Sequence, residues 1–329
     1  MEGLSLYVDV AKVFAGGAVA PEPNILPFVE ESYLFYAGEF NLVFGDTECG
    51  KTWLCLAAVA ATIEDGGRAV VIDLDHNGAP SILNRLEMLG VTRENLIDHQ
   101  CFRMAEPESA IELKQLVADL KVFKPDVVII DSLGEVMPLF RANSNSADDF
   151  TMVHADVIDP LRQAGAAVIV VDHLSKGAES RAFGPTGTSA KKRAVGGTSI
   201  RVSAEKAFRP EDGGRAKLEL DKDRHGGVRK QVPGSDSRPV IGTFTLTEED
   251  GHLVYSFQPA LTVPIPKQAE IDAEQVENDV AQLLKLHEDG EQFGNIRAVK
   301  DALNCGQPRA KRALESYRAL SATSTQSAA

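Results

Sequence analysis

Eight consecutive residues carry the clearest chemical signal in the chain: Gly45-Asp46-Thr47-Glu48-Cys49-Gly50-Lys51-Thr52. They match the phosphate-binding pattern G-x-x-x-x-G-K-[ST] at every fixed position. The glycines let backbone N–H groups approach a polyphosphate closely, Lys51 can neutralise its β and γ phosphates, and the Thr52 hydroxyl can ligate Mg²⁺. The pattern predicts a site for a nucleoside triphosphate with Mg²⁺, against the alternative of a Gly-containing surface turn.

An acidic residue suited to the same metal ion ends a second apolar run. Asp131 closes PDVVIID (residues 125–131), which reads as a buried strand. A strand-terminal Asp is more often only a cap, but a Mg²⁺ site beside a phosphate loop needs such a carboxylate. We therefore expect Asp131 to hold the Mg²⁺ shell, through Thr52 or through water.

Two further polar groups follow apolar runs at residues 69–74 (AVVIDL) and 167–172 (AVIVVD). Asp75 lies just beyond the first run and His173 just beyond the second. Because ligands collect at the carboxyl ends of parallel strands, both side chains are expected near the phosphates. His173 could then sense the γ phosphate, the alternative being a local hydrogen bond at the strand end.

A basic segment follows His173. Residues 176–201 contain six basic side chains and one acid in a Gly-, Ser- and Thr-rich sequence. Clustered cations in such a loop suit contact with a phosphate backbone, preferably that of single-stranded DNA. The expected DNA contacts are Lys176, Arg181, Lys191, Lys192 and Arg193. A plain solvated loop is the alternative.

The apolar runs and the segments between them predict an α/β fold with a mostly parallel central sheet. Helices are expected at residues 52–61, 80–89, 109–122 and 148–163, with a mobile loop before the last. From residue 198 the chain changes to short strands separated by turns, which predicts antiparallel additions at the sheet edge. Lys222 and Arg224 end one of these strands, where alternation places both on one face and Asp223 on the other. Two solvated charges near a turn are the alternative.

Domain boundaries follow the changes in composition. They give a lead-in at residues 1–38, a nucleotide-binding domain at 39–258, a Pro-containing linker at 259–275, a helical unit at 276–320 and a disordered tail at 321–329. In the helical unit, three apolar faces and the turn NCGQP outline a helix-turn-helix or winged-helix domain. Its basic last helix would read DNA or dock a partner, and the sequence favours neither.

The 329-residue chain has a formal net charge of -14 and 43% hydrophobic residues. That charge argues against a protein that coats nucleic acid non-specifically, although a local basic face is compatible with it. The four cysteines form no C-x-x-C pair, so neither a zinc site nor a disulfide framework is indicated. No apolar run approaches a bilayer-spanning length and residues 1–12 lack the features of a signal peptide, so a cytoplasmic location without membrane contact is expected.

Five motifs in order carry a family resemblance: FNLVFGDTECGKTW, AVVIDLDHNGAPSILNRLEMLG, DVVIIDSLGEV, AVIVVDHLSK and LELDKDRHGG. Over residues 35–258 the chain resembles the RecA-type ATPase core of the RepA-like and DnaB-like helicases, which are encoded on plasmids, phages and actinobacterial mobile elements. The resemblance implies a ring-forming, often hexameric, homo-oligomer that uses ATP and Mg²⁺ and acts on single-stranded DNA. Replication proteins are further expected partners.

The same resemblance assigns roles to individual residues. His173 resembles the sensor at the strand end, and the basic loop falls where such rings contact DNA in their central channel. Lys222 and Arg224 resemble the K-x-R pair that is inserted into the neighbouring subunit's site. The catalytic base departs from the pattern: where the family commonly carries a glutamate, this chain has Asp75, which is one methylene shorter. Glu48 is a less favoured substitute.

The expected function is that of a DNA-dependent ATPase, either a helicase or a helicase-like replication factor. Two rival functions stay open. One is a RecA- or KaiC-like NTP switch, which binds nucleotide and assembles without unwinding DNA. The other is a DNA-binding regulatory or loading protein in which ATP only controls assembly.

Overall fold

The structure is a computed structural model that describes most of the chain. The described residues are 9–16, 20–29, 32–174, 184–209, 212–232, 236–249, 251–260, 268–288, 293, 296–303, 305, 309–310 and 312–318. The chain divides into two compact units, residues 1–261 and 262–329.

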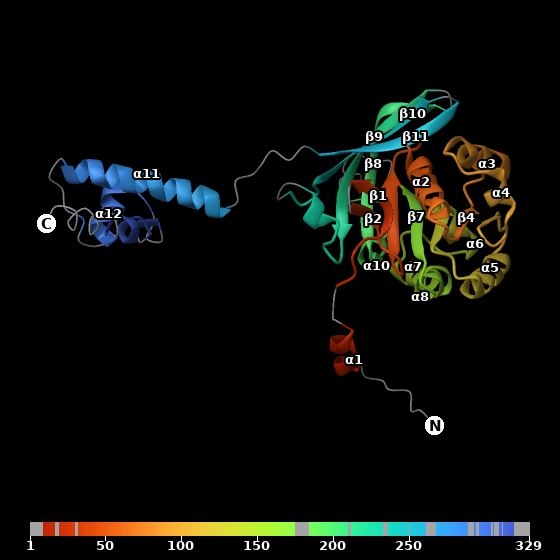
Figure 1. The fold of residues 1–329 in the computed structure, drawn as a ribbon. Coiled ribbons are helices and arrows are strands. Elements are labelled where there is room, and N and C mark those ends of the chain that lie inside the picture. Colours follow the sequence, from red (N-terminus) through yellow and green to blue (C-terminus); the bar gives the residue numbers. More distant parts are fainter. Residues whose placement is uncertain are drawn as a thin grey trace. The chain divides into compact units, whose positions relative to one another are not determined.

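Among the described residues of the first unit, a nine-stranded mixed sheet has the order β11-β10-β9-β8-β3-β7-β6-β4-β5 (Figure 1). Its parallel part contains β3 (Phe40–Gly45), β4 (Ala69–Asp73), β5 (Phe102–Ala105), β6 (Val127–Asp131) and β7 (Ala167–His173). Every residue of β3, β4 and β6 is buried, as uninterrupted apolar runs predict for strands covered on both faces. Because these strands run parallel, their carboxyl ends meet at one edge of the sheet.

Helices cover both faces of the parallel strands. One core contains Val43 and Val71 with residues of α2 and α3, and the other contains Leu42 and Val70 with residues of α5 to α8. Consecutive strand residues therefore point into opposite cores. The helices are α2 (Lys51–Glu64), α3 (Ala79–Met88), α4 (Arg93–Ile97), α5 (Ala110–Phe123), α6 (Leu133–Leu139), α7 (Ala147–Val153), the π-helical turn η1 (His154–Ile158) and α8 (Asp159–Gln163).

The antiparallel part of the sheet begins at β8 (Thr198–Arg209), which pairs in parallel with β3. It continues through β9 (Gly213–Asp223), β10 (Val240–Glu249) and β11 (His252–Pro259), with the short 3₁₀ turn η2 (Arg229–Gln231) after β9. These strands confirm the predicted antiparallel additions and the α/β fold with a large mixed sheet. Since β8 is paired with β3 only as far as Val202, the rest of β8 extends beyond the end of β3 and reaches Gly50 of the phosphate loop through Phe208.

The N-terminal lead-in contributes more than a connector. After α1 (Val10–Ala15), β1 (Ile25–Val29) and β2 (Ser32–Phe35) form an antiparallel hairpin. Phe35 and Tyr36 are fully buried in the core of the first unit. The Tyr36 hydroxyl donates to Oδ1 of Asp223 at 2.8 Å, which anchors the end of β9 to the lead-in.

Two segments differ from the sequence prediction. α6 occupies the start of the predicted mobile loop, because Leu133, Val136 and Met137 recur at helical spacing and are buried. Within the predicted flexible basic loop, α10 (Ala190–Ala194) forms a short helix. The helix predicted over residues 148–163 is present as α7, η1 and α8 in succession.

The second unit contains α11 (Gln268–Glu288), α12 (Ile296–Leu303) and further helical residues at 312–318. α11 begins inside the predicted linker, since no proline follows Pro266 there and the Ala-, Glu- and Gln-rich sequence favours a helix. Leu283, Val299 and Leu314 are buried in a separate small core. The helix-turn-helix or winged-helix assignment stays a prediction, and the predicted tail at 321–329 lies outside the described residues.

Candidate nucleotide site

The phosphate loop joins β3 to α2 at the carboxyl edge of the parallel strands. Gly50 has a φ of 97°, which favours glycine, and α2 begins at Lys51 with no side-chain cap. The N–H groups of the first helical turn are thus open to an anion, with the positive end of the helix dipole behind them. A Cβ atom at Gly45 would overlap the Val202 carbonyl oxygen, so glycine is required where β8 packs against the loop.

Lys51 is buried inside the loop. Its ammonium donates to the carbonyl oxygens of Asp46 and Gly45, the latter at 3.3 Å, and lies 4.0 Å from the Cys49 sulfur. These acceptors carry no full charge, whereas phosphate oxygens do and form stronger hydrogen bonds with an ammonium. A polyphosphate bound in the loop would therefore replace these carbonyl oxygens as the hydrogen-bond acceptor of the Lys51 ammonium.

Thr52 and Asp131 meet where β6 ends beside α2. The Thr52 hydroxyl donates to Oδ2 of Asp131 at 2.8 Å. Burial, together with the carboxylates of Asp75 and Asp73, raises the pKa of Asp131 to about 6, although the hydrogen bond from Thr52 opposes the shift. A hydroxyl beside a carboxylate supplies the oxygen ligands that Mg²⁺ prefers, and a divalent cation would offset the desolvation of Asp131. The pair fits Mg²⁺.

Asp73 and Asp75 are two carboxylates at the end of β4 that have different environments. Asp73 is buried and accepts hydrogen bonds from the Asn77 side chain at 3.0 Å and the Gly78 backbone N–H at 2.8 Å. Asp73 therefore holds the loop that leads into α3. Asp75 is exposed and lines the cavity, which leaves its carboxylate open to a water molecule or a phosphate.

His173 lies across from Asp75. Its Nε2 is 3.9 Å from Oδ1 of Asp75, and the Ser132 hydroxyl donates to the same oxygen at 3.4 Å. The other ring nitrogen of His173 is buried and has no hydrogen-bond partner among the described residues. The two predicted site residues from separate strands are therefore brought together, with one edge of the imidazole directed at the carboxylate.

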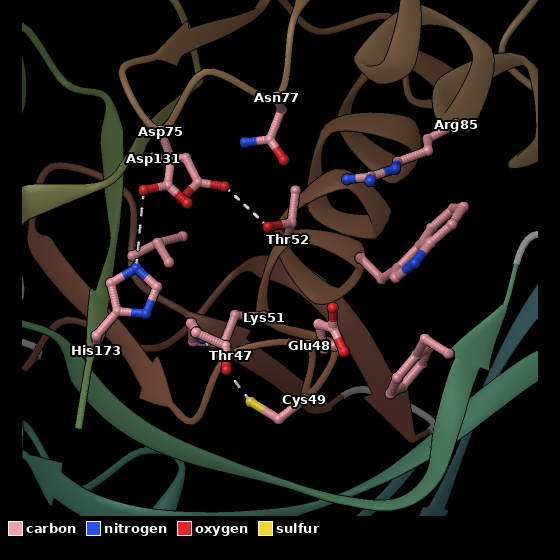
Figure 2. A pocket seen from close by; sticks show the side chains of 14 residues that line it. Thr47, Glu48, Cys49, Lys51, Thr52, Asp75, Asn77, Arg85, Asp131 and His173 are labelled. Carbon is pink, nitrogen blue, oxygen red and sulfur yellow. Dashed lines mark hydrogen bonds and ion pairs between the residues drawn. The ribbon is translucent and has the colours of Figure 1, made fainter. Parts of the chain in front are cut away.

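These residues line a cavity of about 470 Å³ (Figure 2). Residues 47–52 of the phosphate loop line it, whereas the carbonyl groups of Gly45 and Asp46 lie behind it against Lys51. Figure 2 shows Asp75 and His173 on one side of the cavity, Arg85 on the opposite side and Thr52 between them. Five lining residues were not predicted from the sequence: Trp53, Asn77, Arg85, Val171 and Phe208. Trp53 directly follows Thr52, which is a usable sequence signal, but nothing in the sequence pointed to Phe208.

The basic segment differs from its predicted role. Lys191 is buried, and its ammonium lies 2.8 Å from Oδ2 of Asp172, also buried, so Lys191 cannot contact DNA in this conformation. No local sequence pattern indicates that Lys191 has a buried partner, because that partner lies on another element. Lys192 is half-exposed and pairs with Asp221 at 2.9 Å, and Arg193 is exposed. Lys176 and Arg181 lie outside the described residues.

Lys222 and Arg224 point to the same side of the chain, as alternation predicts. The Lys222 ammonium donates to the carbonyl oxygens of Lys192, Arg193 and Val195 at 2.7 to 3.0 Å. The Arg224 guanidinium donates to two of the same oxygens, those of Val195 at 3.2 Å and Arg193 at 2.9 Å. Both cations thus cap the carboxyl end of α10 within their own subunit.

The surroundings of this pair explain its geometry. Burial, together with the neighbouring cations Arg224 and Lys192, lowers the pKa of Lys222 to about 8. Asp223 faces the other way and accepts hydrogen bonds from the Tyr36 hydroxyl and the backbone N–H groups of Gly226 and Arg229. The end of β9 is therefore fixed from both sides.

Within the described part of the chain, every helix is too short or too polar to span a bilayer. The same residues contain no cluster of three or more His, Cys, Asp and Glu side chains that could hold a metal ion. Mg²⁺ at the Thr52–Asp131 pair would thus depend on phosphate and water oxygens for its remaining ligands, as is usual for this ion.

Comparison with known proteins gives one family match and several partial relatives. Residues 10–179 match the family model described as AAA domain. Protein RecA of Mycoplasma mobile is 30% identical over 117 residues, 35% of this chain and 32% of the relative. Protein RecA of Synechocystis sp. is 33% identical over 115 residues, 34% of this chain and 29% of the relative. The chain therefore spans about a third of the length of these curated relatives.

Among solved structures, the chain is similar to a KaiC-like protein from Pyrococcus horikoshii OT3. The two are 13% identical, the match covers 73% of this chain and 97% of the other, and the TM-score is 0.49.

Proposed function

Because the chain belongs to the AAA domain family and is a RecA-type P-loop ATPase, we propose that it hydrolyses ATP in a Mg²⁺-dependent and DNA-dependent manner. The finer proposal is a RepA- or DnaB-like helicase, or a helicase-like replication factor, that assembles into a ring and acts on single-stranded DNA. Replication proteins are proposed partners.

One observation carries the ATPase proposal: the 2.8 Å hydrogen bond between Thr52 and Asp131. It joins the last residue of the phosphate loop to the end of a strand that is far away in the sequence. A phosphate-loop hydroxyl held against a strand-terminal carboxylate is the arrangement that P-loop NTPases use for Mg²⁺. A Gly-containing surface turn would have no reason to keep a carboxylate buried at this place.

The other cavity residues then take separate roles. The N–H groups at the start of α2 and the Lys51 ammonium bind the polyphosphate. Asp75, on the cavity wall, accepts a proton from the attacking water, and His173 across from it orients the γ phosphate. Thr52 and Asp131 hold Mg²⁺, which neutralises charge on the phosphate oxygens when it is bound.

The DNA part of the proposal has narrower support. Arg193 is exposed, and α10 ends beside Lys222 and Arg224, so that basic side chains from two segments adjoin one another. A cationic surface of this kind suits the phosphates of a single strand. Arg224 is further proposed to act on the ATP of a neighbouring subunit.

A second candidate is a nucleotide-driven assembly switch that does not unwind DNA. Two observations favour it. Lys191 is buried against Asp172, so it is not available to contact DNA in a channel. Lys222 and Arg224 cap α10 in their own subunit, so they are not directed at the ATP of a neighbouring subunit. In such a protein, ATP binding would control assembly, and hydrolysis would reset it.

The decisive experiment measures ATP turnover with Mg²⁺, with and without single-stranded DNA, together with the native mass of the complex. The ATPase proposal predicts turnover in the wild type and none in Lys51→Ala, which loses the cation that binds the β and γ phosphates. Turnover that single-stranded DNA stimulates, together with ATP-dependent strand displacement, supports the helicase. Nucleotide-dependent assembly without displacement supports the switch, and equal turnover in Lys51→Ala refutes the site.

A further inference from the structure

The positions of the Lys222 and Arg224 side chains depend on α10, a helix of only five residues. Five hydrogen bonds join the two cations to the carbonyl oxygens of Lys192, Arg193 and Val195, and the Arg193 oxygen accepts one from each cation. We call these five hydrogen bonds the α10 cap. Because the last four carbonyl groups of a helix have no donor within it, most carbonyl groups of so short a helix depend on outside donors. The α10 cap therefore stabilises α10 while it fixes both cations.

The α10 cap holds two cations with neutral acceptors. Within the described part of the chain, neither Lys222 nor Arg224 lies at ion-pair distance from a carboxylate. Burial, together with the neighbouring cations Arg224 and Lys192, lowers the pKa of Lys222 to about 8, so the cations repel one another here. Charged phosphate oxygens form stronger hydrogen bonds with ammonium and guanidinium groups than neutral carbonyl oxygens do. A phosphate within reach therefore competes with the α10 cap for both cations.

Two residues of α10 take part in the cap through their carbonyl groups and leave their side chains to a second partner. The Arg193 side chain is exposed. The Lys192 ammonium lies 2.9 Å from Oδ2 of Asp221, a buried carboxylate that also pairs with Arg238 at 2.8 Å. Lys192 can therefore leave Asp221 without stranding a buried charge. Any ligand that moves these two side chains also moves the carbonyl groups that form the cap.

Resting on the DNA-dependent ATPase proposed above, we propose that α10 is an autoinhibitory element: its carbonyl groups hold Lys222 and Arg224 within their own subunit until single-stranded DNA binds. Phosphates of the strand bind the side chains of Lys192 and Arg193, which displaces the carbonyl groups of the same residues and breaks the α10 cap. Arg224 is then free to reach the γ phosphate in a neighbouring subunit. Turnover without DNA is low because this cation is held back, and the affinity for ATP is the same in both states.

Ala194, the last residue of α10, provides variants that weaken the α10 cap without removing a charge. Ala194→Pro disfavours the helical conformation at Arg193, the acceptor that both cations share, and should destabilise α10 by up to about 100-fold, against about fivefold for Ala194→Gly. ATP turnover without DNA should rise in that order, with ATP affinity unchanged. Adding Arg224→Ala should remove the gain. Ala118→Gly, at an exposed position of α5, is the matched control and should leave turnover unchanged.

Hydrogen exchange of the wild type gives a measurement that does not depend on catalysis. The backbone amides of residues 190–195 should exchange faster when a single-stranded oligonucleotide is bound. Equal exchange in both states, or a wild type that binds no oligonucleotide, overturns the inference. Unchanged turnover in Ala194→Gly and Ala194→Pro also overturns it, as does a gain that survives Arg224→Ala. A wild type without turnover at any DNA concentration overturns the ATPase proposal instead, and exchange at α10 then decides the inference by itself.

Discussion

The Lys191 ammonium nitrogen lies 2.8 Å from Oδ2 of Asp172, and both side chains are almost wholly buried. Asp172 is the residue before His173, whose backbone N–H donates to the other carboxylate oxygen at 2.9 Å. Burial raises the pKa of Asp172, and the Lys191 ammonium acts in the opposite direction. The ion pair thus ties α10 to the strand end that carries the proposed γ-phosphate sensor.

Loss of Lys191 should destabilise the protein. Lys191→Ala leaves the Asp172 carboxylate buried and unpaired, which typically costs about 3 to 5 kcal/mol. Arg193→Ala, in the same short helix but exposed, is the matched control and should change the unfolding free energy little. Urea unfolding of both variants measures the difference. Equal stability of the two would show that the Lys191–Asp172 pair is not formed in solution.

DNA binding should depend on Arg193 and not directly on Lys191. If Arg193 contacts a phosphate, Arg193→Ala should lower the slope of log affinity against log salt by about 0.7 for single strands. Fluorescence anisotropy with a labelled oligonucleotide at several salt concentrations gives the slope. An unchanged slope would place the DNA contacts elsewhere, for example in the second unit.

Asp131→Asn should abolish Mg²⁺-dependent turnover and yet stabilise the protein in metal-free buffer. With a pKa of about 6 in the folded state, Asp131 opposes folding at neutral pH by up to about 3 kcal/mol, at ~1.4 kcal/mol for each pKa unit. The substituted amide can still accept the hydrogen bond from Thr52 but carries no charge.

The destabilisation by the Asp131 carboxylate depends on pH. A carboxyl whose pKa is raised by folding is protonated in both states at low pH, so it carries no penalty there. The penalty grows as pH rises from about 4 to 6 and is complete above that range. The stability advantage of Asp131→Asn, measured by denaturant unfolding, should therefore be absent near pH 4, grow as the pH rises to 6 and be complete above pH 6. A constant advantage across this window would contradict the burial of the charge.

Asp75→Asn should bind ATP and fail to hydrolyse it. General-base catalysis typically contributes about 10² to 10⁴-fold, and the amide cannot accept the proton. Asp75→Glu keeps the carboxylate and should retain measurable turnover, which makes it the matched control. Nucleotide titration and a phosphate-release assay separate binding from catalysis. If Asp75→Asn is silent, another carboxylate is the base.

Arg224→Ala decides between a trans-acting role and a local one. As an arginine finger, Arg224 would contribute about 10³ to 10⁵-fold to turnover, and mixing Arg224→Ala with Lys51→Ala subunits should restore part of it. The exposed Arg229, close by in the chain, provides the control Arg229→Ala, which should retain turnover. If a proven co-assembly shows no recovery, the role of Arg224 is to cap α10 through the carbonyl groups of Arg193 and Val195.

Short segments of the sequence were enough to predict much of the site. The phosphate-loop pattern is continuous, and apolar runs of strand length that end in an acid or a histidine marked Asp131, Asp75 and His173. In a parallel sheet, such strand ends must meet at one edge. That rule was enough to bring Thr52, Asp131, Asp75 and His173 around one cavity, as the structure has them.

Tertiary packing was needed to establish which charges are free and which distant side chains reach the site. The five residues of α10 are too few for hydrophobic periodicity to indicate which face is buried. Lys191 is buried because it pairs with Asp172, which lies on another element. Asp73 and Asp75 have different environments because the loop that leads into α3 folds back and donates hydrogen bonds to Asp73 alone. Phe208 reached the phosphate loop because β8 extends beyond β3 and two glycines make room for its ring. The burial of Lys191, the environment of Asp73 and the position of Phe208 all depend on contacts between residues far apart in the sequence, which no local sequence pattern indicates.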